Sequence, residues 1–170
     1  LLTAVARLKT KHSQIRILLA GRGLDVGNVE LVDLMQRLDV ADRCLLVGEV
    51  RDVPRIYQAM DVFCLHSRTE GCPNALGEAM ASALPCVATD AGDAAALLGD
   101  GGEVVPIEDP AALAGALERL VVAGPEQWRL SGARARQRIV DQFSMEQNYR
   151  RFVDLYDQIQ QHRSGDTCVE

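Results

Sequence analysis

Short apolar runs alternate with segments of helical spacing along the chain. The apolar runs predict strands, and the runs at 61–65 and 85–89 are typical of strands buried within a parallel sheet. The predicted strands span residues 14–20, 43–47, 61–65, 85–89 and 103–106, the last of them at an edge of the sheet. Apolar residues that recur every three or four positions predict the helices. These span residues 1–12, 28–39 and 74–83, and further helices begin at Pro110, Pro125 and Ser144.

The alternation of strand and helix predicts an α/β fold with a doubly wound parallel sheet and helices on both of its faces. In such a fold the loops that follow the strands gather at the carboxyl edge of the sheet, where ligands bind. We expect one domain over residues 1–162, and we expect the polar residues 163–170 to form a disordered tail.

Composition narrows the classes of partner. Apolar residues make up 48% of the chain and aromatic residues 4%, so the core is expected to consist mainly of Leu, Val and Ala. A net charge of −6 argues against a nucleic-acid partner, because binding one requires a surplus of cations to neutralise its phosphates. The five cysteines are odd in number and show no CxxC spacing. This pattern indicates a reducing cytosol rather than a disulfide framework or a zinc site.

The stretch 67–85 concentrates the polar chemistry of the chain. A strand leads into it, and Pro73 and Asn74 start a helix whose first free N–H groups favour an anion such as a phosphate. Glu70 in the loop and Glu78 on the helix do not suit a phosphate, but carboxylates accept hydrogen bonds from hydroxyl groups. The combination suggests a ligand that is part phosphate and part sugar. The alternative is that both glutamates are solvated charges beside a helix start.

The segment Glu70–Ala81 resembles the Glu-x7-Glu motif of the retaining glycosyltransferases of family 4. Those enzymes have two Rossmann-like domains that face a cleft, the GT-B fold, and the motif of the C-terminal domain binds the nucleotide-sugar donor. The resemblance implies that this chain is one half of a GT-B fold, the donor-binding domain. It places Glu78 at the ribose hydroxyls and Glu70, the candidate catalytic residue, at the transferred sugar. The donor-binding positions between them are Gly71, Cys72, Pro73, Asn74 and Ala75.

Further segments carry the same resemblance. Residues 48–61 read Gly-Glu-Val-Arg-Asp, then a short helix with a tyrosine, then Ala-Met-Asp, an order typical of the family. By resemblance the backbone of Val50 lies where the base is read, although hydrophobic packing alone also explains this residue. Gly21 and Gly23 form a Gly-x-Gly loop after the first strand. By resemblance this loop borders the donor cleft, which makes Gly21 a candidate donor-binding residue. For Gly23 the alternative is a tight turn that leaves a buried strand. Residues 89–92 resemble the Thr-Asp-x-Gly turn of the family.

The resemblance also implies what the whole protein does. Such an enzyme moves a hexosyl group from a nucleotide sugar to a glycan, lipid or small-molecule acceptor, in polysaccharide or glycolipid biosynthesis. Members of the family carry a strand, an Arg and a Lys, and a whole acceptor-binding domain upstream of the helix that opens this chain. We therefore expect a fragment that binds the nucleotide sugar through its nucleotide but is inactive alone.

The expected cofactors and partners follow from the same resemblance. We expect no cofactor and no metal, because the chain has no Asp-x-Asp pair that would hold a metal against a diphosphate. The last helix crosses back onto the N-terminal acceptor domain in the family, so that domain is the expected protein partner. A cytoplasmic location is expected, at the inner face of the membrane if the parent associates with it. The arginines of the helix after Pro125 form a basic face that is expected to be solvated, with an anionic membrane surface as the alternative; they are Arg129, Arg134, Arg136 and Arg138.

Two alternative interpretations stay open. A sugar-nucleotide epimerase shares the two-domain fold, although its motif is less like Glu70–Ala81. A non-catalytic, flavodoxin-like switch or binding module is the alternative from a different class. It needs clustered acids after its first strand and a Lys after a late strand, and residues 21–23 and 89–91 supply neither.

Overall fold

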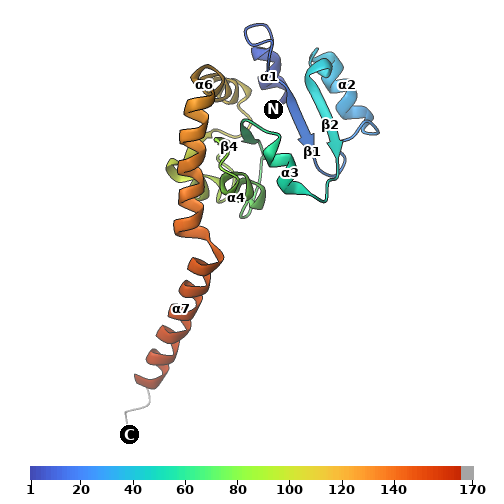
Figure 1. Cartoon of the computed structure of the whole chain (residues 1–170). Helices are drawn as coiled ribbons and strands as arrows, with labels where there is room; N and C mark the ends of the chain where they lie inside the picture. Colours follow the sequence, from blue (N-terminus) through green and yellow to red (C-terminus); the bar gives the residue numbers. More distant parts are fainter. Residues whose placement is uncertain (166–170) are drawn as a thin grey trace.

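A computed structural model describes residues 1–165 of the chain (Figure 1). The strands are β1 (Ile17–Ala20), β2 (Cys44–Gly48), β3 (Phe63–Leu65), β4 (Cys86–Thr89) and β5 (Gly102–Val105). The helices are α1 (Leu2–Leu8), α2 (Val29–Arg37), α3 (Val53–Gln58), α4 (Asn74–Ala81), α5 (Ala94–Leu98), α6 (Pro110–Arg138) and α7 (Met145–Gly165). Short 3-10 turns span Ala41–Arg43 and Gly99–Gly101, and a π-helical turn, Ile139–Phe143, joins α6 to α7.

The strands are parallel and form two sheets. One sheet has the order β1-β2 and the other the order β3-β4-β5, which places β5 at an edge, as predicted. Leu18 lies opposite Leu45 in the first sheet, and Cys64 lies opposite Val87 in the second. The α/β fold of parallel strands flanked by helices is therefore confirmed. The single sheet that we expected is divided, because no ladder joins β1 to β3 within residues 1–165.

β4 is the centre of the three-stranded sheet and is buried along its whole length. Its side chains alternate between two hydrophobic clusters. Cys86 and Ala88 pack with residues of α3, α4 and α5, whereas Val87 packs with residues of α1 and of the first part of α6. Helices thus cover this sheet on both faces, and a strand with both faces covered reads in sequence as a continuous apolar run.

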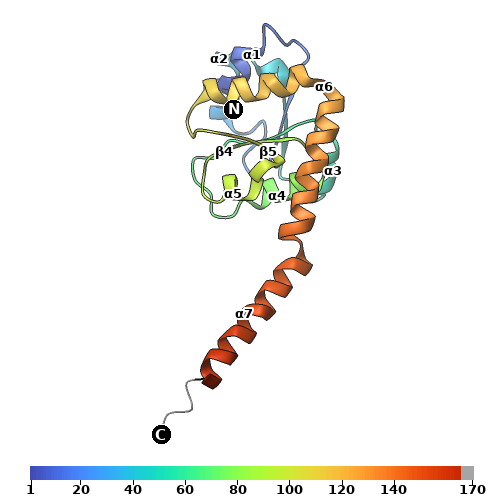
Figure 2. The ribbon, with the colours of Figure 1, turned by 90° about the vertical axis from the view of Figure 1, so that its left-hand side faces the viewer.

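α6 passes from one face of the three-stranded sheet to the other (Figure 2). Its first part contributes Leu113 to the cluster around Val87, and its second part contributes Ala135 to the cluster around Cys86. The two parts are separated at Gly124, whose backbone is not helical (φ 75°, ψ −179°) and which precedes Pro125. The two helices predicted to begin at Pro110 and Pro125 are therefore the two arms of a bent α6.

Part of the predicted basic face is not simply solvated. Arg136 donates a hydrogen bond to Ala81 O at the end of α4. Arg138 donates from Nε to Leu97 O at 2.9 Å and from Nη2 to Ala96 O at 2.7 Å, at the end of α5. The second arm of α6 thereby connects the carboxyl ends of α4 and α5. The positive charges of the two arginines are favourable there, because the carboxyl end of a helix carries a partial negative charge.

The two-stranded sheet is covered differently. Val5 of α1 and Met35 of α2 pack with Ile17 of β1 in one cluster. On the other face of the sheet, Leu45 and Val47 of β2 are 60% and 37% exposed. This half of the domain therefore buries mainly one face of its sheet.

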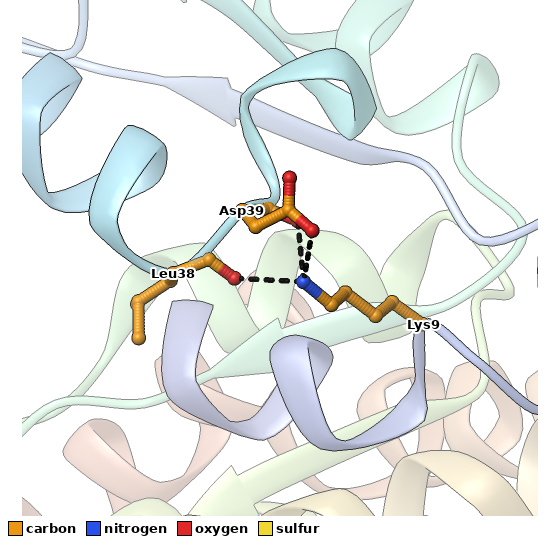
Figure 3. A network of polar contacts seen from close by, with 3 residues as sticks. All are labelled: Lys9, Leu38 and Asp39. Atoms are coloured by element: carbon orange, nitrogen blue, oxygen red, sulfur yellow. Dashed lines mark hydrogen bonds and ion pairs between the residues drawn. The ribbon is translucent and has the colours of Figure 1, made fainter.

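A polar contact fixes the end of α2 to α1 (Figure 3). Lys9 Nζ donates to Leu38 O at 3.1 Å and to Asp39 O at 2.9 Å. It also lies 2.6 Å from Asp39 Oδ2, an ion pair at the surface. Asp39 has a positive φ of 53°, the left-handed conformation in which chains commonly leave a helix.

α7 extends away from the body of the domain (Figures 1 and 2). Ser144 precedes it, and the Ser144 hydroxyl oxygen accepts from the Gln147 N–H at 3.3 Å, which confirms the predicted cap. Its aromatic side chains are mostly exposed: Tyr149 by 71%, Phe152 by 61% and Tyr156 by 64%. α7 continues to Gly165, so residues 163–165 of the expected tail are helical. The rest of that expected tail, 166–170, lies outside the described residues.

Candidate functional site

α4 begins at the end of the loop that leaves β3. Pro73 occupies the N-cap position with an extended backbone (φ −77°, ψ 93°), and its carbonyl accepts from the Leu76 N–H at 3.0 Å. Leu76 and Met80 are fully buried, which holds α4 against the core. The amides at the start of the helix precede any intrahelical acceptor, so they are available to an anion beside the exposed Asn74 and Ala75.

The Glu78 side chain is held by a tyrosine from another helix. Tyr57 of α3 donates its hydroxyl to Glu78 Oε2 at 2.9 Å, and the same hydroxyl lies 3.2 Å from Ala75 O. The Tyr57 ring is buried and makes an edge contact with Phe63, with the ring centroids 5.9 Å apart. Burial, and then the neighbouring Glu78 carboxylate, raise the pKa of Tyr57, so the phenol keeps its proton and remains a donor.

The Glu70 side chain is held by the Ser67 hydroxyl, and the Ser67 backbone is held in turn by Thr89. Ser67 Oγ donates to Glu70 Oε1 at 2.6 Å. Thr89, the last residue of β4 and a buried polar side chain, donates its hydroxyl to Ser67 O at 2.7 Å. The loop that carries Glu70 is therefore connected through Ser67 to the central strand of the three-stranded sheet.

The loop after β4 packs directly against the backbone of Glu70 and Gly71. The Asp93 N–H donates to Gly71 O at 3.0 Å. Gly92 has a positive φ of 54°, and a Cβ placed on it would lie 2.1 Å from Glu70 O. Only a glycine allows the two loops to approach this closely. The Thr-Asp-x-Gly pattern marked this turn in the sequence, but it did not reveal that the turn supports Glu70.

The other predicted site residues occupy two places. Cys72 is exposed and Pro73 is buried in the loop between Glu70 and α4. Gly21 lies at the end of β1, in the two-stranded half, where its N–H donates to Gly48 O at 2.7 Å. Val50 is half-buried and follows Gly48 by two residues. Tyr57, which sequence reasoning placed only within a family pattern, connects the segment after β2 to α4.

Residues 1–165 contain no group of three or more His, Cys, Asp and Glu side chains arranged to bind a metal ion. None of the helices described for this part of the chain combines the length and the apolar character that crossing a bilayer requires.

The comparison with known proteins decides the family. A model of the family described as "Glycosyl transferases group 1" matches residues 1–122. The chain belongs to this family. It is 32% identical over 136 residues to the lipopolysaccharide core biosynthesis mannosyltransferase LpsB of Rhizobium meliloti. That alignment covers 76% of this chain and 38% of the mannosyltransferase.

Solved glycosyltransferases share the fold of this member of the family. Sucrose-phosphate synthase from Thermosynechococcus elongatus superposes with a TM-score of 0.77 at 25% identity, over 93% of this chain and 42% of the synthase. Anabaena HepE in complex with UDP superposes with a TM-score of 0.82 at 21% identity, over 93% of this chain and 44% of HepE. The fold is thus that of one half of a GT-B glycosyltransferase. The chain spans less than half the length of these proteins.

Proposed function

We propose that this glycosyltransferase-family chain is the donor-binding domain of a retaining, family 4-type enzyme. In this proposal Glu78 accepts hydrogen bonds from the ribose hydroxyls of a nucleotide sugar. Glu70 faces the transferred sugar and is the catalytic residue. The N–H groups at the start of α4 receive a phosphate, with Gly71, Cys72 and Pro73 lining the approach.

The observation that carries this proposal is the way the two carboxylates are held. A protein hydroxyl engages one oxygen of each: Ser67 Oγ binds Glu70 Oε1, and the Tyr57 hydroxyl binds Glu78 Oε2. The second oxygen of each carboxylate is then available to a hydroxyl of the ligand. Two fixed acceptors on either side of a helix N-terminus suit a ligand that has sugar hydroxyls on both sides of a phosphate.

The base is expected to lie toward the two-stranded half. Gly21 and Val50 follow β1 and β2, at the carboxyl ends of parallel strands, where folds of this class bind ligands. HepE, which shares this fold, was crystallised with UDP and with UDP-glucose. A nucleotide that extends from Val50 to Glu78 would pass α3, whose Tyr57 already contacts α4.

The rest of the parent protein completes the enzyme in this proposal. We expect an upstream acceptor domain, an upstream strand and an upstream Arg and Lys, and we expect the chain alone to bind donor without transferring sugar. The division between β1 and β3 supports a strand supplied by that upstream segment. The exposed aromatic side chains of α7 support a contact with the acceptor domain, because such stripes pack against a partner when one is present.

The remaining proposals concern the parent in the cell. We propose a cytoplasmic hexosyltransferase of polysaccharide or glycolipid biosynthesis that uses neither a metal nor a cofactor. The relative LpsB, a lipopolysaccharide core biosynthesis mannosyltransferase, supports the biosynthetic role. Arg129 and Arg134, both exposed on α6, support a peripheral contact with an anionic membrane surface. Donor binding that disappears on addition of a chelator would contradict the metal-independent mechanism.

The test of the proposed function is a binding titration of the chain with UDP, GDP and ADP by calorimetry, and with the corresponding nucleotide sugars. A charge-assisted hydrogen bond contributes roughly 1.5–3 kcal/mol, so Glu78→Gln is expected to weaken both free nucleotide and nucleotide sugar by about ten- to a hundredfold. Glu70→Gln is expected to leave free nucleotide nearly unaffected, to weaken the nucleotide sugar, and to abolish turnover in the full-length parent.

The matched control is Glu30→Gln, which removes an exposed carboxylate from the first turn of a different helix, α2. It is expected to leave all affinities unchanged. Small and equal effects of the Glu70, Glu78 and Glu30 substitutions would show that both candidate glutamates are surface charges. No binding of UDP, GDP or ADP to the wild-type chain would overturn the proposed function altogether.

A further inference from the structure

Tyr57 is a buried residue whose side chain has one polar atom, the hydroxyl oxygen, and this atom is directed at the candidate site. Its ring packs against Phe63 within the cluster that also contains Leu76 and Met80 of α4. Its hydroxyl reaches Glu78 Oε2 at 2.9 Å and Ala75 O at 3.2 Å. The ring therefore serves the core, whereas the hydroxyl contacts one side-chain atom and one backbone atom of α4.

The Glu78 side chain would have considerable freedom without this contact. Glu78 is exposed on α4, and a glutamate has several rotatable bonds that an exposed position leaves free. A donor at 2.9 Å selects one orientation of the carboxylate before any ligand arrives. Preorganisation of this kind improves affinity, because the cost of ordering the side chain is no longer incurred on binding.

The contact with Ala75 O positions the Tyr57 hydroxyl relative to α4. Ala75 lies in the first turn of α4, where the N–H groups proposed to bind a phosphate are located. One hydroxyl thus lies between the acceptor proposed for the ribose and the turn proposed for the phosphate. Burial keeps the phenol protonated, so that it stays a donor and the carboxylate stays the acceptor.

We propose that Tyr57 is a positioning residue for the donor: its hydroxyl holds the Glu78 carboxylate in the orientation in which the second oxygen accepts from a ligand hydroxyl. This inference rests on the proposed function, because it assigns Tyr57 an effect on binding only through Glu78. A purely structural role of Tyr57 would reside in the ring, and phenylalanine preserves the ring.

The experiment is a double-mutant cycle on the whole chain with UDP as the probe. Tyr57→Phe, Glu78→Gln and the double variant are compared with wild type by calorimetry. Tyr57→Phe is expected to weaken UDP binding about three- to tenfold in the wild-type background. It is expected to have no further effect in the Glu78→Gln background, because the carboxylate to be oriented is already gone.

Two additional measurements separate positioning from packing. Three-bond NMR couplings of the Glu78 side chain, recorded without ligand, are expected to indicate one rotamer in wild type and averaged rotamers in Tyr57→Phe. Tyr149→Phe removes a hydroxyl from an exposed ring on α7 and is the matched control, with no expected effect on the couplings or on UDP affinity.

The outcomes distinguish this inference from the proposed function. An equal loss from Tyr57→Phe in both backgrounds would assign Tyr57 a structural role and overturn the positioning role. So would unchanged affinity in Tyr57→Phe while Glu78→Gln still weakens binding, and in that case the proposed function stands. If Glu78→Gln has no effect on UDP binding, the proposed role of Glu78 fails and the role of Tyr57 fails with it.

Discussion

The two halves of the domain support their loops in different ways. In the three-stranded half, β4 is buried on both faces, and the side chains of Thr89 and Ser67 connect the loops at its carboxyl edge. The Tyr57 hydroxyl connects α3 to Glu78 of α4. In the two-stranded half, β2 exposes Leu45 and Val47. The loop after β1 is held there by backbone bonds between Gly21, Leu24 and Gly48, and by a bond from Asn28 Nδ2 to Gly23 O within the loop itself.

The difference indicates where accurate positioning is built into this fold. Side-chain hydrogen bonds anchored in a doubly covered sheet restrict the orientation of particular groups, here the two carboxylates. The bonds of the loop after β1, from the backbone and from Asn28, are local: they define the path of the loop but orient neither of the two carboxylates. The comparison therefore predicts that substitutions in the three-stranded half are more costly and that their effects reach the candidate site.

The largest expected effect comes from the core under α4. Met80→Ala removes a fully buried side chain and is expected to lower the free energy of unfolding by about 2–5 kcal/mol. Leu45→Ala, at a position 60% exposed in the other half, is expected to change it by about 0.5 kcal/mol or less. Urea denaturation of both variants measures the difference. Equal losses would contradict the contrast between the halves.

A pair of glycine substitutions tests how tightly the loops of the two halves are packed. Gly23 and Gly92 both have positive φ, so alanine at either costs about 1–2 kcal/mol for the left-handed backbone. At Gly92 the added Cβ would also lie 2.1 Å from Glu70 O, whereas at Gly23 the nearest atom is 4.0 Å away. Gly92→Ala is therefore expected to be the more destabilising variant and to weaken nucleotide-sugar binding by displacing Glu70. Thermal denaturation measures the loss of stability, and calorimetry measures the affinity for the nucleotide sugar. Similar results for the two variants would show that the loops after β3 and β4 can move apart without cost.

The smallest expected effect is a dependence on pH in the two-stranded half. The hydrogen bond and the charge of Lys9 hold the pKa of Asp39 below its ordinary value. A lowered folded-state pKa contributes stability above the unfolded-state pKa, and this contribution is lost as the pH falls through the folded-state value. Lys9→Met is expected to raise the pKa of Asp39, and part of its destabilisation is expected to disappear in acid. NMR titration of the Asp39 carboxyl group decides this, and an unchanged pKa would show that the ion pair does not form in solution.

The order of strands and helices could be predicted from the sequence, and their ends only in part. Apolar spacing identified each strand, and Pro125 correctly separated the two arms of α6. The predicted first helix ended four residues too late: α1 ends at Leu8, and a turn follows in which the Lys11 and His12 N–H groups both donate to Leu8 O. The division into two sheets could not be predicted, because a run of apolar residues does not specify which strand pairs with it.

The candidate site, too, could be predicted from the sequence only in part. Glu70, Glu78 and the helix start between them were recognisable because they lie close together in sequence. Their supports come from elsewhere in the chain: the Tyr57 hydroxyl reaches across 21 positions to Glu78, and the Thr89 hydroxyl across 22 to Ser67. Such contacts depend on how α3 and β4 pack beside α4 and β3, which local spacing does not encode.

The bend of α6 at Gly124 has an electrostatic consequence for α4. Because the bend carries the second arm around the sheet, Arg136 brings a full positive charge to the carbonyl at the carboxyl end of α4. The partial negative charge at that end is thereby compensated within the protein, while the partial positive charge at the amino end, beside Pro73, faces the position proposed for a phosphate. In the proposed binding mode, Arg136 would thus let α4 act on the phosphate as a single positive pole rather than as a pair of opposed charges.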